Sequence, residues 1–170
     1  MSKAFTKDDD DGAPVLVAPR APLPPGVTNY VTPESFAALR AELAGLLEAR
    51  ALLGAIELDA TRAARAAGLA PRIAELEVRL GNTEVVAPPE QPPDVVRFGA
   101  TVTVRSAVGE ERAYRIVGVD EANAAEGRIG FVAPLARALL GKRVGDTVLL
   151  LTPHGEEELE VAALEYVRRS

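Results

Sequence analysis

The sequence of 170 residues has no cysteine, few aromatic residues and no excess of positive charge. The lack of cysteine excludes disulfides and thiolate metal sites. Aromatic residues make up 4% of the chain, and much of the 48% hydrophobic content is alanine, so one large core is not expected. The formal net charge is −6, whereas a protein that binds duplex DNA directly normally carries a basic face. The composition therefore argues against direct duplex DNA binding as the main activity and favours a protein partner.

Long hydrophobic runs are missing as well. No stretch approaches the roughly 20 apolar residues that a membrane-spanning helix needs. The segment from Met1 to Phe5 also lacks the apolar part of a secretion signal. We therefore expect a cytoplasmic protein without membrane contact.

Residues 1–29 have the composition of a disordered, acidic and proline-rich tail. The acidic run 8–11 is followed by five prolines, which disfavour both helix and strand. The alternative is a tail that folds on a partner. Ordered structure is expected to begin at Tyr30, with Thr32 as a suitable N-cap and Pro33 at the first helical position.

Two apolar seams with spacings of mostly three and four residues predict an antiparallel helical hairpin over residues 30–82. The seam residues are Phe36, Leu39, Leu43 and Leu46 in the first arm and Leu69, Ile73, Leu76 and Leu80 in the second. Arms of equal length place the turn near Glu57 and Asp59. Pro71 lies within the second arm, where proline removes a backbone donor, so we expect a kink there. The alternative is that the regular part of this arm starts near Pro71.

Proline-rich residues 83–97 read as a linker, and the residues after it alternate like strands. Strands are expected over 101–105, 112–117, 128–132, 147–151 and 157–166, with a short helix over 134–140. Residues 98–170 therefore form a mainly antiparallel β domain with one short helix, which puts the chain in the α+β class.

Several motifs of this second half closely resemble the C-terminal domain of the Gre transcript-cleavage factors. They are Phe98-Gly99-Ala100-Thr101-Val102, Tyr114-Arg115-Ile116-Val117-Gly118, the run from Ala133 to Lys142, Gly145-Asp146 and Leu164-Glu165-Tyr166. The segments 32–43 and 73–86 are similar to parts of the two arms of the family's hairpin. The resemblance implies an antiparallel coiled coil followed by an FKBP-like domain.

The resemblance also implies a partner, bacterial RNA polymerase, bound at the rim of its secondary channel with the coiled coil inside. Nascent RNA would be met only through the polymerase. The expected docking residues are Pro134, Leu135, Arg137, Leu140 and Lys142.

The hairpin tip departs from the family pattern. Cleavage-competent members carry Asp-x-x-Glu-Asn followed by an aromatic residue, and the carboxylates hold a Mg²⁺ that activates water in the polymerase active site. Between residues 53 and 70 the only acids are Glu57 and Asp59, and Arg62 follows them. The arms also look shorter than the family's by about seven residues each, or roughly 10 Å of reach. We therefore expect a regulator of transcription that is not an enzyme, with no catalytic residue, metal ion or cofactor of its own.

Two other functions stay open. Glu57 and Asp59 could form a displaced acidic tip that stimulates RNA cleavage in backtracked complexes, or the hairpin could be an adaptor for another cytoplasmic protein. The arginines of the second arm, Arg62, Arg65, Arg72 and Arg79, could face RNA or the channel wall. The plainer interpretation is a polar helix face, balanced by Glu75 and Glu77.

Overall fold

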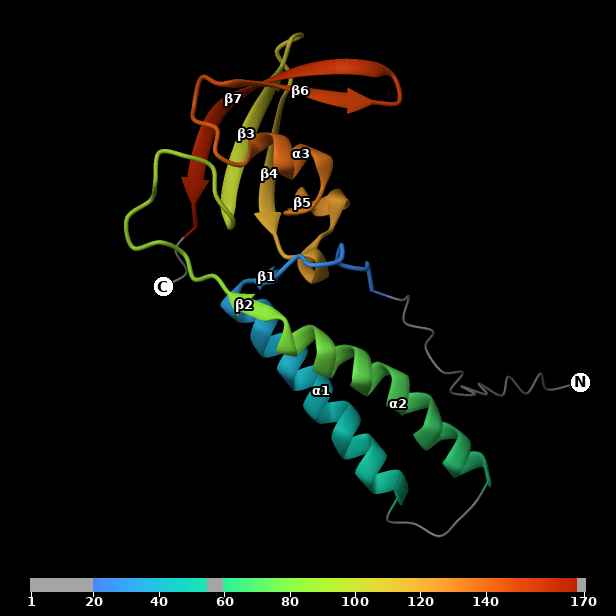
Figure 1. Ribbon diagram of the computed structural model, residues 1–170. Helices are drawn as coiled ribbons and strands as arrows, with labels where there is room; N and C mark the ends of the chain where they lie inside the picture. The colour runs from blue at the N-terminus through green and yellow to red at the C-terminus, as the bar shows by residue number, and fades with distance from the viewer. Residues whose placement is uncertain (1–19, 55–59, 168–170) are drawn as a thin grey trace, which may run out of the picture.

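The computed structural model describes residues 20–54 and 60–167, which form a helical hairpin beside a β domain (Figure 1). The elements are β1 (Asn29–Val31), α1 (Pro33–Gly54), α2 (Ala60–Gly81), β2 (Thr83–Val85), β3 (Ala100–Ser106), β4 (Glu111–Val117), the short 3-10 helices η1 (Val119–Glu121) and η2 (Ala124–Glu126), β5 (Arg128–Gly130), α3 (Pro134–Leu139), β6 (Thr147–Thr152) and β7 (Gly155–Tyr166). This confirms the predicted α+β class. No helix in the described ranges is long and apolar enough to cross a membrane.

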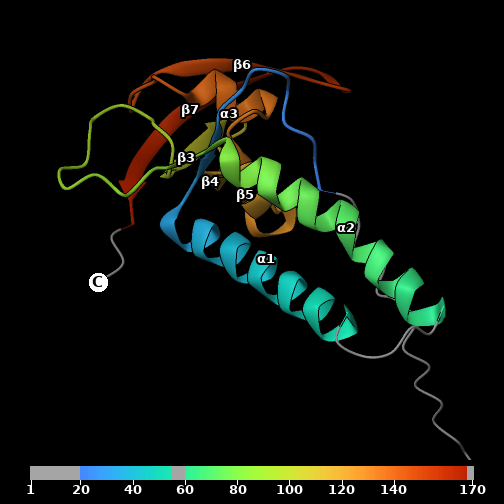
Figure 2. The same ribbon diagram turned by 60° about the horizontal axis from the view of Figure 1, so that its bottom comes forward.

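The two arms lie side by side, as both ribbon views show (Figures 1 and 2). They pack through the predicted seam, because Leu39, Ile73 and Leu76 are all buried. Phe36, Leu43, Leu46 and Leu80 pack against a buried cluster that also includes Val31. Burying a side chain of this size contributes about 1.5–3 kcal/mol, so the seam is sufficient to hold the arms together.

The start of α1 follows the predicted capping pattern. The hydroxyl of Thr32 accepts a hydrogen bond from the backbone N–H of Ser35 at 3.2 Å. This satisfies one of the backbone donors that the first helical turn leaves free. Thr32 is therefore the N-cap, and Pro33 occupies the first helical position.

α2 is helical from Ala60 to Gly81 with Pro71 inside it. The interpretation in which the regular part of the second arm starts near Pro71 is therefore wrong, whereas the kink stays a prediction. Proline offers no N–H to the carbonyl of Ala67, one turn earlier. Pro71 is exposed, whereas Ile73 and Leu76 are buried. The apolar contacts between the two arms therefore do not depend on the residue at which the helix lacks a hydrogen bond.

The β domain is a five-stranded sheet in the order β5-β4-β3-β7-β6. All neighbours are antiparallel except β4 and β5. On one face α3 contributes Ala136 and Leu139 to a core that includes Val102, Val148 and Val161. β5 ends at Gly130, two residues before the end of the predicted strand, because Ala133 donates to the Gly130 carbonyl at 2.8 Å and closes a turn.

The base of the hairpin is closed by a parallel pair of strands that sequence patterns do not predict. β1 pairs with β2, with Asn29 opposite Thr83 and Val31 opposite Val85. The segment interpreted as a linker, residues 83–97, therefore begins as a strand. Both arms of the hairpin are joined where they meet the β domain (Figure 1).

An aromatic cluster links this base to the β domain. The ring of Tyr30 in β1 lies 5.5 Å from that of Phe131 and 6.2 Å from that of Phe98, measured between centroids. These separations and the tilted geometries are those of favourable aromatic pairs. The cluster uses three of the few aromatic residues of the chain to attach the hairpin.

Candidate functional site

The five predicted docking residues lie in α3 or directly after it. Pro134 takes the first helical position after Ala133, whose backbone is extended. Pro134 and Arg137 are exposed, whereas Leu135 and Leu140 are half-buried and pack against the core. Lys142 is half-buried as well. The structure therefore brings these residues into one segment but exposes only two of them fully.

The segment after α3 is fixed to the end of the linker. The backbone N–H of Gly141 donates to the carbonyl of Val96 at 2.8 Å, and the N–H of Val96 donates to Lys142 at 2.7 Å. Val96 itself is buried in the core. These reciprocal hydrogen bonds fix the C-terminal end of α3 against residue 96, so the exposed Arg137 lies on a helix with a defined position.

Tyr166 of β7 holds the same part of the linker. Its hydroxyl donates to the carbonyl of Val95 at 2.7 Å and accepts from the backbone N–H of Arg97 at 2.9 Å. Burial raises the pKa of Tyr166, and the hydrogen bond from Arg97 opposes this rise only in part. The phenol is therefore neutral at physiological pH and acts as a donor to Val95.

The predicted tip lies largely outside the described residues. This applies to Glu57, Asp59 and the side chain of Arg62. In the ranges 20–54 and 60–167, no group of three or more acidic or histidine side chains lies close enough to hold a metal ion. The two arms that carry the tip have 22 residues each, or about 33 Å at the helical rise per residue.

The arginines of α2 do not form one outward surface. The guanidinium of Arg72 lies 3.1 Å from Glu42 of α1, and Arg65 is exposed. Arg79 is only 8% exposed, and its Nε lies 3.1 Å from Oδ2 of Asp120 in η1. The predicted partner Glu75 is present but farther away, at 3.6 Å. Arg72 and Arg79 are thus structural, which disfavours a continuous RNA-facing stripe.

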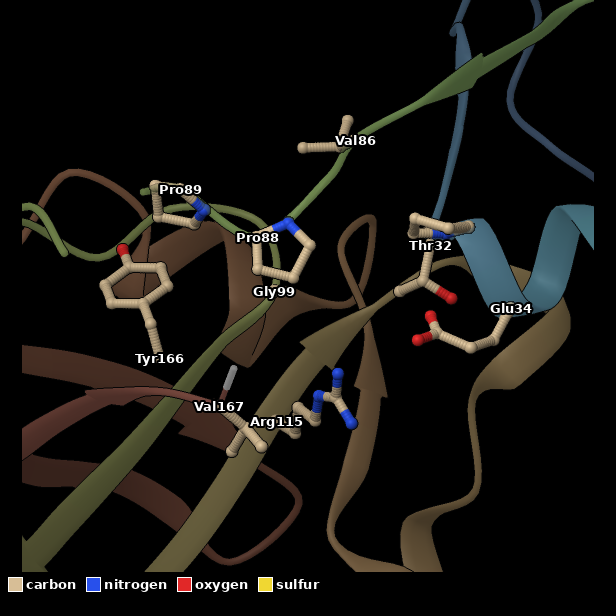
Figure 3. A pocket seen from close by; sticks show the side chains of 10 residues that line it. Thr32, Glu34, Val86, Pro88, Pro89, Gly99, Arg115, Tyr166 and Val167 are labelled. Atoms are coloured by element: carbon tan, nitrogen blue, oxygen red, sulfur yellow. The ribbon is translucent and has the colours of Figure 1, made fainter. Parts of the chain in front are cut away.

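A small hollow near the joint is too small for an organic ligand. Figure 3 shows it between the start of α1, the linker prolines Pro88 and Pro89, and the end of β7. The side chains of Glu34 and Arg115 point into the same space from opposite sides. Its volume is about 20 Å³, enough for a single water molecule. This cavity is therefore a packing feature of the joint.

Asp120, Tyr30 and the strand pair of the hairpin base were not among the residues singled out from the sequence. Asp120 lies 41 positions after Arg79, and no local pattern links an acid in a short 3-10 helix to a helix in another part of the chain. The predicted sites were local segments, namely α3 and the tip. What sequence reasoning missed is the joint between them.

Comparison with known proteins relates the whole arrangement to one family. The family model for the C-terminal part of the transcription elongation factors GreA and GreB matches residues 91–166. GreB of Neisseria meningitidis serogroup A is 35% identical over 155 residues, covering 82% of this chain and 95% of GreB. GreA of Azorhizobium caulinodans is 44% identical over 96 residues, covering 56% of this chain and 61% of that relative.

Solved structures of similar proteins include GreA factor homolog 1 of Thermus thermophilus, at 26% identity. The match covers 82% of this chain and 99% of that protein, with a TM-score of 0.39. The match to GreB alone is long and similar enough to assign the family. On that sequence similarity, the chain belongs to the Gre family of transcription elongation factors.

Proposed function

We propose that this protein binds bacterial RNA polymerase through α3 and places its hairpin in the secondary channel without stimulating transcript cleavage. As a Gre factor it acts on the polymerase during elongation and is not itself an enzyme. Its effect would be to compete with authentic cleavage factors or to limit substrate entry. The observations that support this proposal are the exposure of Pro134 and Arg137 on α3 and the 22-residue length of each arm.

The geometry of α3 supports the docking part. Pro134 and Arg137 are exposed on a helix whose end is tied to Val96, so a partner would meet a preformed surface. A preformed surface loses little conformational entropy on binding. Arg137 also supplies a cation that can pair with an acidic group of the partner.

The length of the hairpin supports the loss of cleavage. The GreB match runs over 155 positions but takes in 82% of the 170 residues here, or about 139, so about 16 positions of the match have no counterpart. If these positions all lie in the hairpin, each arm is about seven or eight residues shorter than in GreB. A tip that ends roughly 10 Å early cannot place carboxylates on a metal ion in the polymerase active site.

The central experiment measures RNA cleavage in a stalled, backtracked elongation complex. The protein is added alone, and then in competition with an authentic GreA. We expect no shortening of the RNA with this protein alone and suppression of GreA-stimulated cleavage in the mixture. RNA shortening by the protein alone would reject the non-cleaving function.

The docking surface is tested separately by polymerase binding. The double variant Pro134→Ala, Arg137→Glu is expected to lose most of its affinity, while Arg112→Glu, the same charge reversal at an exposed arginine of β4, is expected to retain it. Equal affinity of both variants would show that α3 is not the docking surface. Failure of the parent protein to bind polymerase at all would favour the adaptor function.

Glu57 and Asp59 are the residues that decide between the two polymerase functions. If the protein does shorten RNA, the activity should require Mg²⁺ and should disappear in the Glu57→Ala, Asp59→Ala double variant. That result would identify a short but working cleavage factor. Cleavage that survives in the double variant would exclude these two acids as metal ligands.

A further inference from the structure

The segment that precedes the hairpin connects three parts of the molecule. Residues 20–27, called the strap here, run beside the end of α2 before the chain enters β1 (Figures 1 and 2). Sequence composition predicts a disordered tail up to residue 29, but residues 20–29 have defined contacts. The carbonyl of Ala21, for example, accepts a hydrogen bond from the guanidinium of Arg79 at 2.7 Å.

Arg20 lies at the centre of these contacts. One terminal nitrogen of its guanidinium lies 3.2 Å from Oδ1 of Asp120 in the β domain, and the other contacts Glu42 of α1. Arg20 therefore bridges the hairpin and the β domain, and with Arg72 it brackets Glu42. We call Arg20, Glu42, Arg72, Arg79 and Asp120 the base network.

The buried member of the base network is Asp120, whose side chain is 3% exposed. A carboxylate removed from water in this way loses its hydration and needs compensating partners. Here the partners are two arginines from different segments, one on each oxygen, at 3.1 and 3.2 Å. Only Oδ1 receives a hydrogen bond, from Arg20, whereas Oδ2 faces Arg79 as an ion pair without hydrogen-bond geometry. The charge of Asp120 is thus fully compensated only when both the strap and α2 are in place.

Small changes at this place are amplified at the far end of the hairpin. An arm of 22 residues is about 33 Å long, so a tilt of about 10° at the base moves its end by about 6 Å. Contacts at the base therefore control where the tip can be.

We propose that the strap is a positioning element: Arg20, acting through Asp120 and Glu42, sets the direction of the hairpin relative to the β domain. The strand pair and the aromatic cluster attach the hairpin, and Arg20 adds a tether between Glu42 of α1 and Asp120 of the β domain. This inference concerns the free protein and does not depend on polymerase binding.

The test uses the absence of cysteine from the sequence, which makes introduced cysteines the only labelling sites. Spin labels at Arg65→Cys on α2 and His154→Cys in the β6–β7 turn, both exposed, report the distance between hairpin and β domain. Pulsed electron paramagnetic resonance is recorded on the full chain with and without Arg20→Glu, which places a negative charge beside Asp120 and Glu42. The matched control is Arg50→Glu, the same change at an exposed arginine of α1 outside the base network.

The expected result is one narrow distance distribution for the parent and for Arg50→Glu, and a broadened or displaced one for Arg20→Glu. Because Arg65 lies 16 residues, or about 24 Å, from the end of α2 at Gly81, a tilt of about 10° displaces the label by up to about 4 Å. Circular dichroism checks that all variants keep their helix content, so that a shift reports direction and not unfolding. An Arg20→Glu distribution that matches the parent would overturn the proposal. Arg20→Ala provides a second test without charge reversal, and a narrow parent-like distribution for it as well would confirm that Arg20 does not set the direction.

Discussion

Arg79 at the end of α2 and Asp120 in the β domain form an ion pair at 3.1 Å between two nearly buried side chains. Such a pair gains little over apolar residues of the same size, because both charges lose their hydration. The loss of stability therefore differs between removing one of the charged side chains and removing both. Removing Asp120 alone leaves Arg79 without its buried counter-charge, whereas removing Asp120 together with Arg79 leaves only Arg20, which is partly exposed and keeps Glu42 as a partner.

Asp120→Asn is therefore expected to destabilise the protein by about 3–5 kcal/mol, since Arg79 loses its buried counter-charge. The Arg79→Met, Asp120→Leu double variant should lose less than the single one. Urea unfolding followed by circular dichroism measures both. Glu126→Gln serves as the control, because its pair with Arg128 is largely exposed and should be worth no more than about 1 kcal/mol.

Gly118 is expected to be intolerant of any side chain. A Cβ at this position would lie 2.7 Å from the backbone carbonyl of Tyr30 in β1, so the hairpin base would have to move. We expect Gly118→Ala to cost about 1–3 kcal/mol through overpacking. Gly45→Ala in α1 meets nothing within 4 Å and should instead stabilise the helix by about 0.5–1 kcal/mol. Thermal unfolding of the two variants gives opposite shifts if the close approach of β1 is real.

Pro71→Ala is expected to stabilise the hairpin. The change restores an N–H for the carbonyl of Ala67 and removes the ring from a helix interior, worth up to about 3 kcal/mol. Pro71 is exposed, so alanine leaves no cavity in the seam. An increase in melting temperature with unchanged or higher helix content supports this, and a decrease would mean that Pro71 shapes α2 in a way the apolar seam requires.

Glu42 links stability to pH. Burial alone would raise the pKa of its carboxyl group, but hydrogen bonds and charges from Arg20 and Arg72 lower it below the ordinary value of 4.5. A carboxyl group whose pKa is lowered by folding stabilises the protein above that ordinary value and loses this contribution as the pH falls through the lowered pKa. Because Glu42 is partly exposed, the contribution is at most about 1 kcal/mol.

The measurement compares the melting temperatures of the parent and Glu42→Gln from neutral pH downward. The parent should be the more stable protein at neutral pH, and the difference should shrink below about pH 4.5. A difference that stays constant over this range would show that Glu42 acts through packing and not through its charge.

Local patterns predicted much of this fold. The N-cap at Thr32, the seam through Leu39 and Leu76, and the start of α3 at Pro134 all depend on neighbours within a few turns, which periodicity and capping preferences report directly. The docking residues could be assigned to one segment for the same reason.

The joint could not be predicted because its contacts are distant in sequence. β1 and β2 have three residues each, too short for an alternating pattern, and they pair across a separation of 54 positions. Arg79 was interpreted as part of a polar helix face, whereas it pairs with Asp120 in another part of the chain. Tyr30, Phe98 and Phe131 come from three separate segments, and only the folded chain brings their rings together.

The parallel pairing of β1 with β2 fixes the two arms to each other at the end of the hairpin that meets the β domain. The length of the hairpin can therefore change without a change in how it is attached to that domain. Because both helices are joined at the base, residues can be added or removed at the opposite end in matched numbers without disturbing the β domain. Each pair of seven-residue segments changes the length of the hairpin by about 10 Å and preserves the register of the seam. Deletions at that end can therefore shorten the reach of the hairpin while the β domain and the joint stay the same.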